Sequence, residues 1–280
     1  MLSEPAIRGA VTGGLWTSVT VVPSTGSTNA DLLAAGGPEG QVLVAEQQTA
    51  GRGRMGRTWV SQPGAALTFS VLLRPSAVPG GQAGAPGANP DAPAGQADWV
   101  PLPPERVGWL PLLAGVAVAR GIREASGLPA TLKWPNDVLI DGRKLAGILA
   151  ERSGHAVVIG IGVNVATPQD ALPSGPGGLR ATSLAIEGAE VPRDRLLIEI
   201  LRQFEHHYAA IRENPDPSAI GLLADYETLC ATLGRAVRVE LPTGRSVSGE
   251  ATGIAPDGSL LVTDEGVTTA VSAGDVVHVR

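Results

Sequence analysis

Residues 131–165 carry the pattern that most restricts the fold of this chain. Asp141-Gly142 is typical of a tight hairpin turn, and apolar stretches stand on both sides of it. The stretch from Lys144 to Glu151 should therefore pair antiparallel with Val138 to Ile140. A further apolar stretch from His155 to Val165 predicts the next strand of the same meander. We expect a largely antiparallel sheet at the centre of the molecule.

The remaining segments predict an α+β fold, in which helices flank a mixed, largely antiparallel sheet. Strands are predicted at 18–22, 41–46, 67–74 and 131–134. A hydroxyl side chain of the Ser27-Thr28-Asn29 segment can cap a helix that Gly36-Gly37 ends. Helical spacing predicts a helix at 108–126, stopped by Gly127, and a mostly helical region over 180–232 with helices at 194–211 and about 220–232.

The pattern along the chain predicts two domains. Residues 1–232 form the larger one, and 233–280 change to five short strands with turns, which predicts a small C-terminal β-barrel. Residues 76–104 are dominated by Pro, Gly and Ala, so we expect a mobile surface insertion there. Residues 1–17 show no clear period and predict a partly ordered lead-in.

Composition limits the possible partners and the cellular setting. A net charge of −6 over 280 residues offers no overall attraction for nucleic acid or an anionic membrane. The most apolar stretch, 109–122, is too short to span a bilayer and predicts a buried helix. One cysteine, Cys230, and no secretory segment predict a reducing, cytoplasmic setting. The four histidines show no metal-ligand spacing, so no protein metal site is predicted.

Lysine is scarce in this chain. Of 21 basic residues, 19 are arginine, and the two lysines, Lys133 and Lys144, stand within a dozen residues of each other. An ammonium is a compact charge on a flexible stem, whereas a guanidinium is a planar fork, so the two are not equivalent at a tight site. The scarcity of lysine therefore marks this short segment as a functional candidate.

The segment from Gly51 to Trp59 (GRGRMGRTW) superficially matches two nucleotide motifs. Both the dinucleotide motif and the phosphate loop require a helix directly after the glycines. Pro63-Gly64 argues against such a helix, and the segment 48–89 contains no acidic residue to bind a ribose. What remains is a loop in which arginines alternate with glycines, as suits an anion bound by backbone amides and guanidinium groups.

Five motifs in order resemble the biotin–protein ligases: Ser27-Thr28-Asn29, AEQQTAGRGRMGRTW (45–59), KWPNDV (133–138), RKLAGILAE (143–151) and GIGVNV (160–165). The resemblance implies a class II synthetase-like catalytic domain, the small terminal β-barrel, and ATP-dependent biotin attachment to a lysine of a biotin carboxyl carrier protein. It implies ATP and magnesium as co-substrate and activator, and biotin as substrate. The first motif begins at residue 27, which predicts a monofunctional enzyme without the DNA-binding domain of one family branch.

The resemblance also assigns roles to individual residues. Lys144 and Arg54 are the expected catalytic residues, with Lys144 beside the biotin carboxylate and the α-phosphate. Arg52 and Arg54 are expected to close over biotin and the activated acyl phosphate. Biotin binding is expected from Ser27, Thr28, Asn29, Gln48, Gly51, Arg52, Gly53, Arg54, Lys144 and Gly147. ATP binding is expected from Arg54, Trp59, Asn136, Asp137, Lys144 and Asn164.

Three other functions remain open at this stage. A lipoate–protein ligase would share the fold and the adenylation chemistry. A non-enzymatic protein could retain biotinyl-adenylate as a signal. A phosphate-loop ATPase would require a helix immediately after Gly56.

Overall fold

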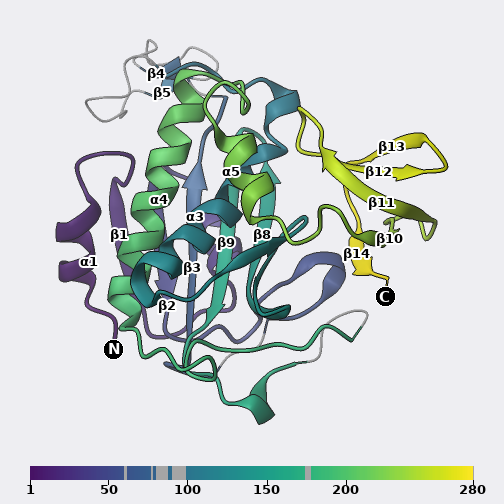
Figure 1. Ribbon diagram of the computed structural model, residues 1–280. Coiled ribbons are helices and arrows are strands. Elements are labelled where there is room, and N and C mark those ends of the chain that lie inside the picture. Colours follow the sequence, from purple (N-terminus) through teal and green to yellow (C-terminus); the bar gives the residue numbers. More distant parts are fainter. Residues whose placement is uncertain (60–61, 77, 80–87, 90–98, 174–177, 280) are drawn as a thin grey trace.

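The computed structural model describes residues 1–59, 62–76, 78–79, 88–89, 99–173 and 178–279. A seven-stranded sheet forms the centre, with the strand order β1-β2-β3-β9-β8-β7-β6 (Figure 1). β1 and β2 are parallel and every other neighbouring pair is antiparallel, so the predicted mixed sheet and the meander are confirmed. Its strands are β1 (Ser18–Val22), β2 (Gln41–Ala45), β3 (Ala66–Leu73), β6 (Thr131–Lys133), β7 (Asp137–Ile140), β8 (Arg143–Ser153) and β9 (Ala156–Asn164).

The two faces of this sheet carry very different side chains. Successive residues of a strand point to opposite faces, so β9 places Ile159, Ile161 and Val163 on one face, in the main hydrophobic core. The intervening residues of β9 include Val158, which is buried, and Gly160 and Gly162, which add no side chain to the other face. One face is therefore committed to packing, and the glycine part of the other face leaves room for a site.

Two long helices, α3 (Trp109–Ser126) and α4 (Arg193–Glu213), cover the apolar face (Figure 1). A Cβ on Gly121 of α3 would lie only 2.7 Å from Ile200 of α4, so glycine allows the two helices their close contact. Gly127 ends α3 in the left-handed conformation, as predicted. None of the helices in the described ranges is long and apolar enough to cross a membrane.

Shorter helices complete the first part of the chain. α2 (Thr28–Ala35) lies on the other face of the sheet, where Leu32 packs against Leu72 and Val158. α5 (Leu222–Leu229) packs against α3. Short 3-10 turns occur at Arg54–Gly56, Pro104–Arg106 and Gln169–Ala171, and β4 (Val78–Pro79) pairs with β5 (Ala88–Asn89).

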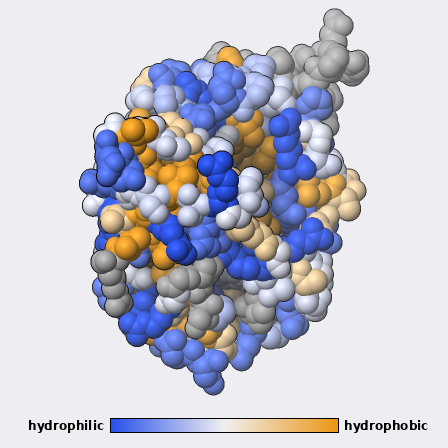
Figure 2. All heavy atoms as spheres, turned by 90° about the vertical axis from the view of Figure 1, so that its right-hand side faces the viewer, coloured by the Kyte–Doolittle hydropathy of each residue, from blue (hydrophilic) through white to orange (hydrophobic). Residues whose placement is uncertain are grey.

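The five C-terminal strands form a second, antiparallel sheet in the order β13-β12-β11-β10-β14. The predicted strands are thus confirmed, and the pairing leaves β13 and β14 as edge strands. Figure 2 shows the side that carries this sheet, where hydrophobic patches alternate with hydrophilic side chains. Its strands are β10 (Ala236–Glu240), β11 (Ser246–Ile254), β12 (Leu260–Asp264), β13 (Val267–Val271) and β14 (Asp275–His278).

Two tryptophans of the first part of the chain hold a turn of this second sheet. The indole nitrogen of Trp109 donates to the Pro256 carbonyl at 2.9 Å, and that of Trp134 donates to the Gly258 carbonyl at 3.1 Å. Both rings are buried, so these hydrogen bonds are shielded from water. The second sheet is thereby fixed against the end of the first one.

One sequence expectation is wrong. The lead-in contains a helix, α1 (Glu4–Val11), because Ile7 and Val11 are buried against the rest of the fold. The region 180–232 holds the two expected helices, but its first stretch, 180–192, is turn and extended chain, and α4 begins only at Arg193. Most of the 76–104 insertion lies outside the described residues, so its mobility stays a prediction; Trp99 and Leu102 at its end are buried in the core.

A buried ion pair ties α4 to the sheet. The Arg212 guanidinium lies 3.4 Å from a Glu39 carboxylate oxygen, and both side chains are almost fully buried. Glu39 also accepts from the Tyr208 hydroxyl and, at 2.8 Å, from the Arg74 amide. Arg212 lies 5.0 Å from the centre of the Trp99 ring. Burial and the Glu39 carboxylate raise the pKa of Tyr208 well above its usual value.

We predict that Arg212→Met destabilises the protein by about 3–5 kcal/mol, because it leaves the Glu39 carboxylate buried without its cation. Adding Glu39→Gln should recover part of this loss. Arg202→Met is the control on the same helix, because Arg202 forms an exposed pair with Glu199 and should lose no more than about 1 kcal/mol. Denaturant unfolding measures all three, and equal losses for the two arginines would contradict the assignment.

Candidate functional site

A cavity of about 410 Å³ lies over the bare face of the first sheet. α2, the glycine–arginine loop, β8, β9 and the segment after β9 all contribute to its walls. Its lining residues are Ser27, Thr28, Asn29, Gln48, Arg52, Gly53, Arg54, Gly56, Arg57, Thr58, Trp59, Phe69, Asn136, Lys144, Gly147, Ile148, Leu149, Gly160, Ile161, Gly162, Asn164, Pro173, Leu179 and Ala181.

Glycines of β8 and β9 make the floor of the cavity. A Cβ on Gly162 would lie 2.4 Å from the Trp59 ring, and one on Gly147 would lie 3.2 Å from it. A Cβ on Gly160 would lie 2.3 Å from the Asn29 amide oxygen. Any side chain at these positions would displace what now rests on the floor. The strands therefore need glycine here because other groups approach their backbone closely.

One end of the cavity is built from uncharged polar groups that bind one another. The Gln48 amide oxygen accepts from the Thr28 backbone amide at 2.9 Å and from the Thr28 hydroxyl at 3.0 Å. The Ser70 hydroxyl lies 2.6 Å from the Thr28 hydroxyl and donates to the Asn29 amide oxygen at 2.6 Å. The Ser27 hydroxyl caps α2 by accepting from the Ala30 amide. This network fixes several donors and acceptors before any ligand arrives.

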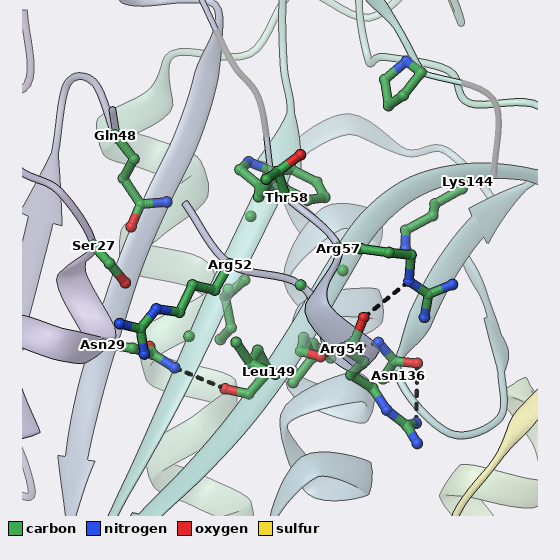
Figure 3. Close-up of a pocket in the computed structure, with 18 of the residues that line it drawn as sticks. Ser27, Asn29, Gln48, Arg52, Arg54, Arg57, Thr58, Asn136, Lys144 and Leu149 are labelled. Atoms are coloured by element: carbon green, nitrogen blue, oxygen red, sulfur yellow. Dashed lines mark hydrogen bonds between the residues drawn. The ribbon is translucent and has the colours of Figure 1, made fainter. Parts of the chain in front are cut away.

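Glu151 of β8 joins this end to the glycine–arginine loop. Its carboxylate accepts from the Asn29 amide at 2.8 Å and lies 3.3 Å from the Arg52 guanidinium. Asn29 also donates to the Leu149 carbonyl at 3.2 Å (Figure 3). Since Arg52 is paired with Glu151, this end of the cavity carries no unbalanced charge.

The other end of the cavity carries positive charge. Lys144 places its ammonium 2.5 Å from the Asp137 carboxylate. The Arg54 guanidinium donates to the Asn136 amide oxygen at 3.4 Å, and Arg57 lies 3.0 Å from Asp275 of the second sheet. Figure 3 shows Lys144, Arg54, Arg57 and Asn136 on the side of the cavity opposite Ser27, Asn29 and Gln48. A ligand with one neutral end and one anionic end fits this arrangement.

Burial shifts the pKa of two basic groups at or near this end, Lys133 and Arg54. It lowers the pKa of the Lys133 ammonium, an effect that the Asp137 carboxylate opposes. It also lowers the pKa of the Arg54 guanidinium, against the attraction of Asp275 and Asp137. Both shifts have the same cause, because removing a cation from water disfavours its charged form.

A β-bulge directs Lys144 into the cavity. Between β7 and β8 the register shifts, so that Val138 pairs with Ala146 but Leu139 pairs with Lys144. Leu145 is the extra residue and is buried in the core. Without the bulge, Lys144 and Gly147 would point to opposite faces. With it, the Lys144 ammonium lies 3.3 Å from the place of a Gly147 Cβ.

The glycine–arginine loop is a tight turn rather than the start of a helix. Gly53 donates to the Arg57 carbonyl at 2.7 Å, and the Arg57 side chain donates to the Arg54 carbonyl at 3.0 Å. Met55 and Gly56 both have positive φ, and Arg57 is extended. The helix that a phosphate-loop ATPase requires after Gly56 therefore does not form at Arg57, and that alternative is wrong.

The cavity brings together most of the residues expected from the sequence. Gly51 and Asp137 do not line the cavity. Gly51 contacts Gln48 and Trp59, which do line it, and Asp137 forms an ion pair with Lys144. Asn164 lines it, but its amide donates to the Thr182 carbonyl at 3.0 Å. Arg52 and Arg54, expected to act together, contact different ends of the cavity.

Sequence reasoning missed several parts of the site. Ser70 is one of two polar residues, with Thr68, in an otherwise apolar strand, and the alternating glycines of GIGVNV could have revealed the floor. The sequence predicts no individual role for Arg57, which lines the cavity and pairs with Asp275. Pro173, Leu179 and Ala181 also line the cavity, and no local pattern marks them in the sequence.

Comparisons with known proteins identify the family of this chain. Residues 18–164 match the Biotin/lipoate A/B protein ligase family, and residues 232–279 match the Biotin protein ligase C terminal domain. A biotin–[acetyl-CoA-carboxylase] ligase of Mycobacterium tuberculosis is 41% identical, over 100% of this chain and 96% of that protein. The bifunctional ligase/repressor BirA of Bacillus subtilis is 33% identical, over 90% of this chain and 71% of that protein.

A solved structure has the same fold. The biotin protein ligase from Aquifex aeolicus in complex with biotin and ATP superposes with a TM-score of 0.73 and 26% identity, over 95% of this chain and 100% of that one. Sequence and structure thus agree over nearly the full length. The chain belongs to the biotin protein ligase family.

Proposed function

We propose that this protein activates biotin with ATP and transfers it to a lysine of a biotin carboxyl carrier protein. In the first step a biotin carboxylate oxygen attacks the α-phosphorus of ATP, which forms biotinyl-5′-AMP and releases pyrophosphate. In the second step the carrier lysine amine attacks the acyl carbon of the mixed anhydride, and AMP leaves with the bonding electrons. Neither step needs a nucleophile from the enzyme, so catalysis rests on positioning and charge stabilisation.

The contrast between the two ends of the cavity carries this proposal. Biotin has an uncharged ureido ring at one end and a carboxylate at the other. The network of Thr28, Asn29 and Gln48 offers fixed, neutral hydrogen-bonding groups that suit the ring. Lys144 and Arg54 supply positive charge where the carboxylate and the ATP phosphates would meet. The glycine floor and Trp59 offer an apolar surface between the two ends.

The proposed roles at the nucleotide end follow from the same contacts. Lys144, held by Asp137, would neutralise the charge that develops at the pentavalent phosphorus. Arg54, held by Asn136, would close over the acyl phosphate. We assign Trp59 to the apolar wall and Asn164 to the support of Thr182, beside the nucleotide rather than on it.

Magnesium would enter this site with ATP. Mg²⁺ usually keeps several waters and binds phosphate oxygens together with one or two carboxylates. Asp137 offers a carboxylate of this kind beside Lys144. In the described ranges no group of three or more His, Cys, Asp or Glu side chains could hold a metal by itself. We also propose a cytoplasmic location, which the single cysteine supports.

The direct test is mass spectrometry of an apo carrier domain incubated with the protein, ATP, magnesium and biotin. We expect one biotinyl group on one lysine of the carrier. Pyrophosphate exchange that depends on lipoate instead of biotin would identify a lipoate ligase. Adenylate formation without labelling of the carrier would favour a protein that stores the adenylate.

We predict that Lys144→Arg strongly reduces adenylate formation while the protein stays folded. Arginine keeps the charge, but its planar fork would bind Asp137 in a bidentate manner and turn away from the phosphate. Biotin-dependent pyrophosphate exchange measures the loss, which we expect to reach about a hundredfold. Arg152→Lys on the exposed end of the same strand is the control, and near-normal exchange in Lys144→Arg would contradict the assignment.

We predict that Arg54→Gly releases biotinyl-5′-AMP into solution. Without this side chain the cavity loses its link to Asn136, so water and free adenylate can exchange. Added bystander protein should then acquire biotin on many lysines, as detected by streptavidin blotting. Arg245→Gly, in an exposed turn of the second sheet, serves as the control. Retention of the adenylate in the Arg54 variant would count against this role.

We predict that Gly162→Ala raises the KM for biotin by about tenfold or more, because a methyl group would push Trp59 off the floor. Gly9→Ala is the matched control, since a Cβ at Gly9 meets no atom within 4 Å. Steady-state kinetics on both variants gives the comparison. An unchanged KM in Gly162→Ala would show that Trp59 does not form part of the biotin site.

A further inference from the structure

The backbone of Lys144 is held by a segment that lies far along the chain. The ladder between β8 and β9 begins at Ala146, so it does not include Lys144. Instead, the Lys144 amide donates to the Arg180 carbonyl at 2.8 Å, and the Thr182 amide donates to the Lys144 carbonyl at 2.9 Å. Both backbone groups of Lys144 are therefore bound on this side by residues 180–182.

Glu187 fastens this segment to the start of β8. One of its carboxylate oxygens accepts from the Thr182 hydroxyl, and the other accepts from the Arg143 guanidinium at 2.8 Å. Thr182 is a hydrogen-bond partner of the Lys144 backbone, and Arg143 directly precedes Lys144. One carboxylate thus joins the two pieces of chain that hold the lysine.

The burial of Glu187 strengthens these two hydrogen bonds. The Glu187 side chain is 9% exposed and that of Arg143 is 32% exposed, so water screens their attraction less than at the surface. Hydrogen bonds to an ionised carboxylate are also the stronger kind. The Glu187 amide donates to the Ser183 carbonyl at 3.1 Å, which fixes the turn from which the side chain extends.

We propose that Glu187 is a positioning residue for Lys144 in adenylate formation. The bulge alone directs Lys144 to the cavity face, but a bulge leaves one residue unpaired and tolerates local movement. The carboxylate of Glu187 holds the outer side of the bulge in place through Thr182 and Arg143. This role depends on the proposed function, since it assigns the lysine to the attack on ATP.

Separate assays of the two half-reactions test this role. In Glu187→Gln, kcat for biotin-dependent pyrophosphate exchange should fall about ten- to a hundredfold. The KM for biotin should change by less than about threefold, because the neutral end of the cavity is untouched. Transfer from supplied biotinyl-5′-AMP to an apo carrier domain should stay near the wild-type rate. Glu190→Gln, an exposed neighbour, should leave both half-reactions unchanged.

Substitutions of Thr182 test the link itself. Thr182→Ser keeps the hydroxyl and should retain exchange, whereas Thr182→Val should lose as much as Glu187→Ala. The double variant Thr182→Val/Glu187→Ala should be no slower in exchange than either single variant, because each single substitution already breaks the hydrogen bond between Thr182 and Glu187. An equal fall of exchange and transfer would indicate a general structural role and overturn the proposal, as would unchanged exchange in Glu187→Gln.

A measurement without catalysis separates this proposal from the proposed function. The chain has two lysines, so selective isotope labelling of lysine gives two side-chain signals in an NMR spectrum, and Lys144→Arg identifies one. Glu187→Gln should shift the Lys144 signal more than that of Lys133, and Glu190→Gln should shift neither. An unmoved Lys144 signal would overturn the positioning role even in an active enzyme. An inactive wild-type protein that shows the shift would overturn the proposed function alone.

Discussion

The alternation of side chains along β9 is the constraint on which the rest of this structure depends. Isoleucine and valine on one face bind the strand to the layer of α3 and α4, while Gly160 and Gly162 add no side chain to the other face, where Asn29 and Trp59 approach the backbone. A single strand can serve both purposes because its period is two. The core thereby sets the depth of the cavity floor, and a rigid floor is what a small, rigid ligand needs for a well-defined position.

A ligand with an anionic end also needs a cation at one end of the cavity, and Lys144 supplies it. In a regular strand, however, Lys144 and Gly147 would point to opposite faces of the sheet. One extra residue, Leu145, solves this, because it enters the core and lets its neighbour face the cavity. Asp137 then pairs with the Lys144 ammonium, but Arg54 binds the neutral Asn136, so this end keeps a positive charge, while Glu151 balances Arg52 at the other end. Partly buried charges at both ends thus have partners, so the site is ordered before its ligands bind.

The sequence predicts the strands and helices well because their signals are local: a hairpin dipeptide, apolar periods and helix-ending glycines. Twelve of the fourteen residues expected at the site line the cavity, because the five motifs meet at one face of the sheet, and they make up half of its 24 lining residues. The helix α1 was missed because its burial depends on contacts with α4. Glu187 was missed for a similar reason, since its role depends on Arg143, which lies forty-four residues earlier in the chain, as well as on the nearby Thr182. The bulge at Leu145 depends on a pairing register that no local pattern reveals.

The orientation of biotin in this cavity is the central claim, and a crystal structure of the protein with biotin tests it most directly. The account predicts that the ureido ring lies against Thr28 and Gln48, that the ring system lies beside Trp59 above the glycine floor, and that the carboxylate points to Lys144. A reversed ligand, with its carboxylate beside Asn29 and Glu151, would contradict the account, as would density for biotin outside this cavity.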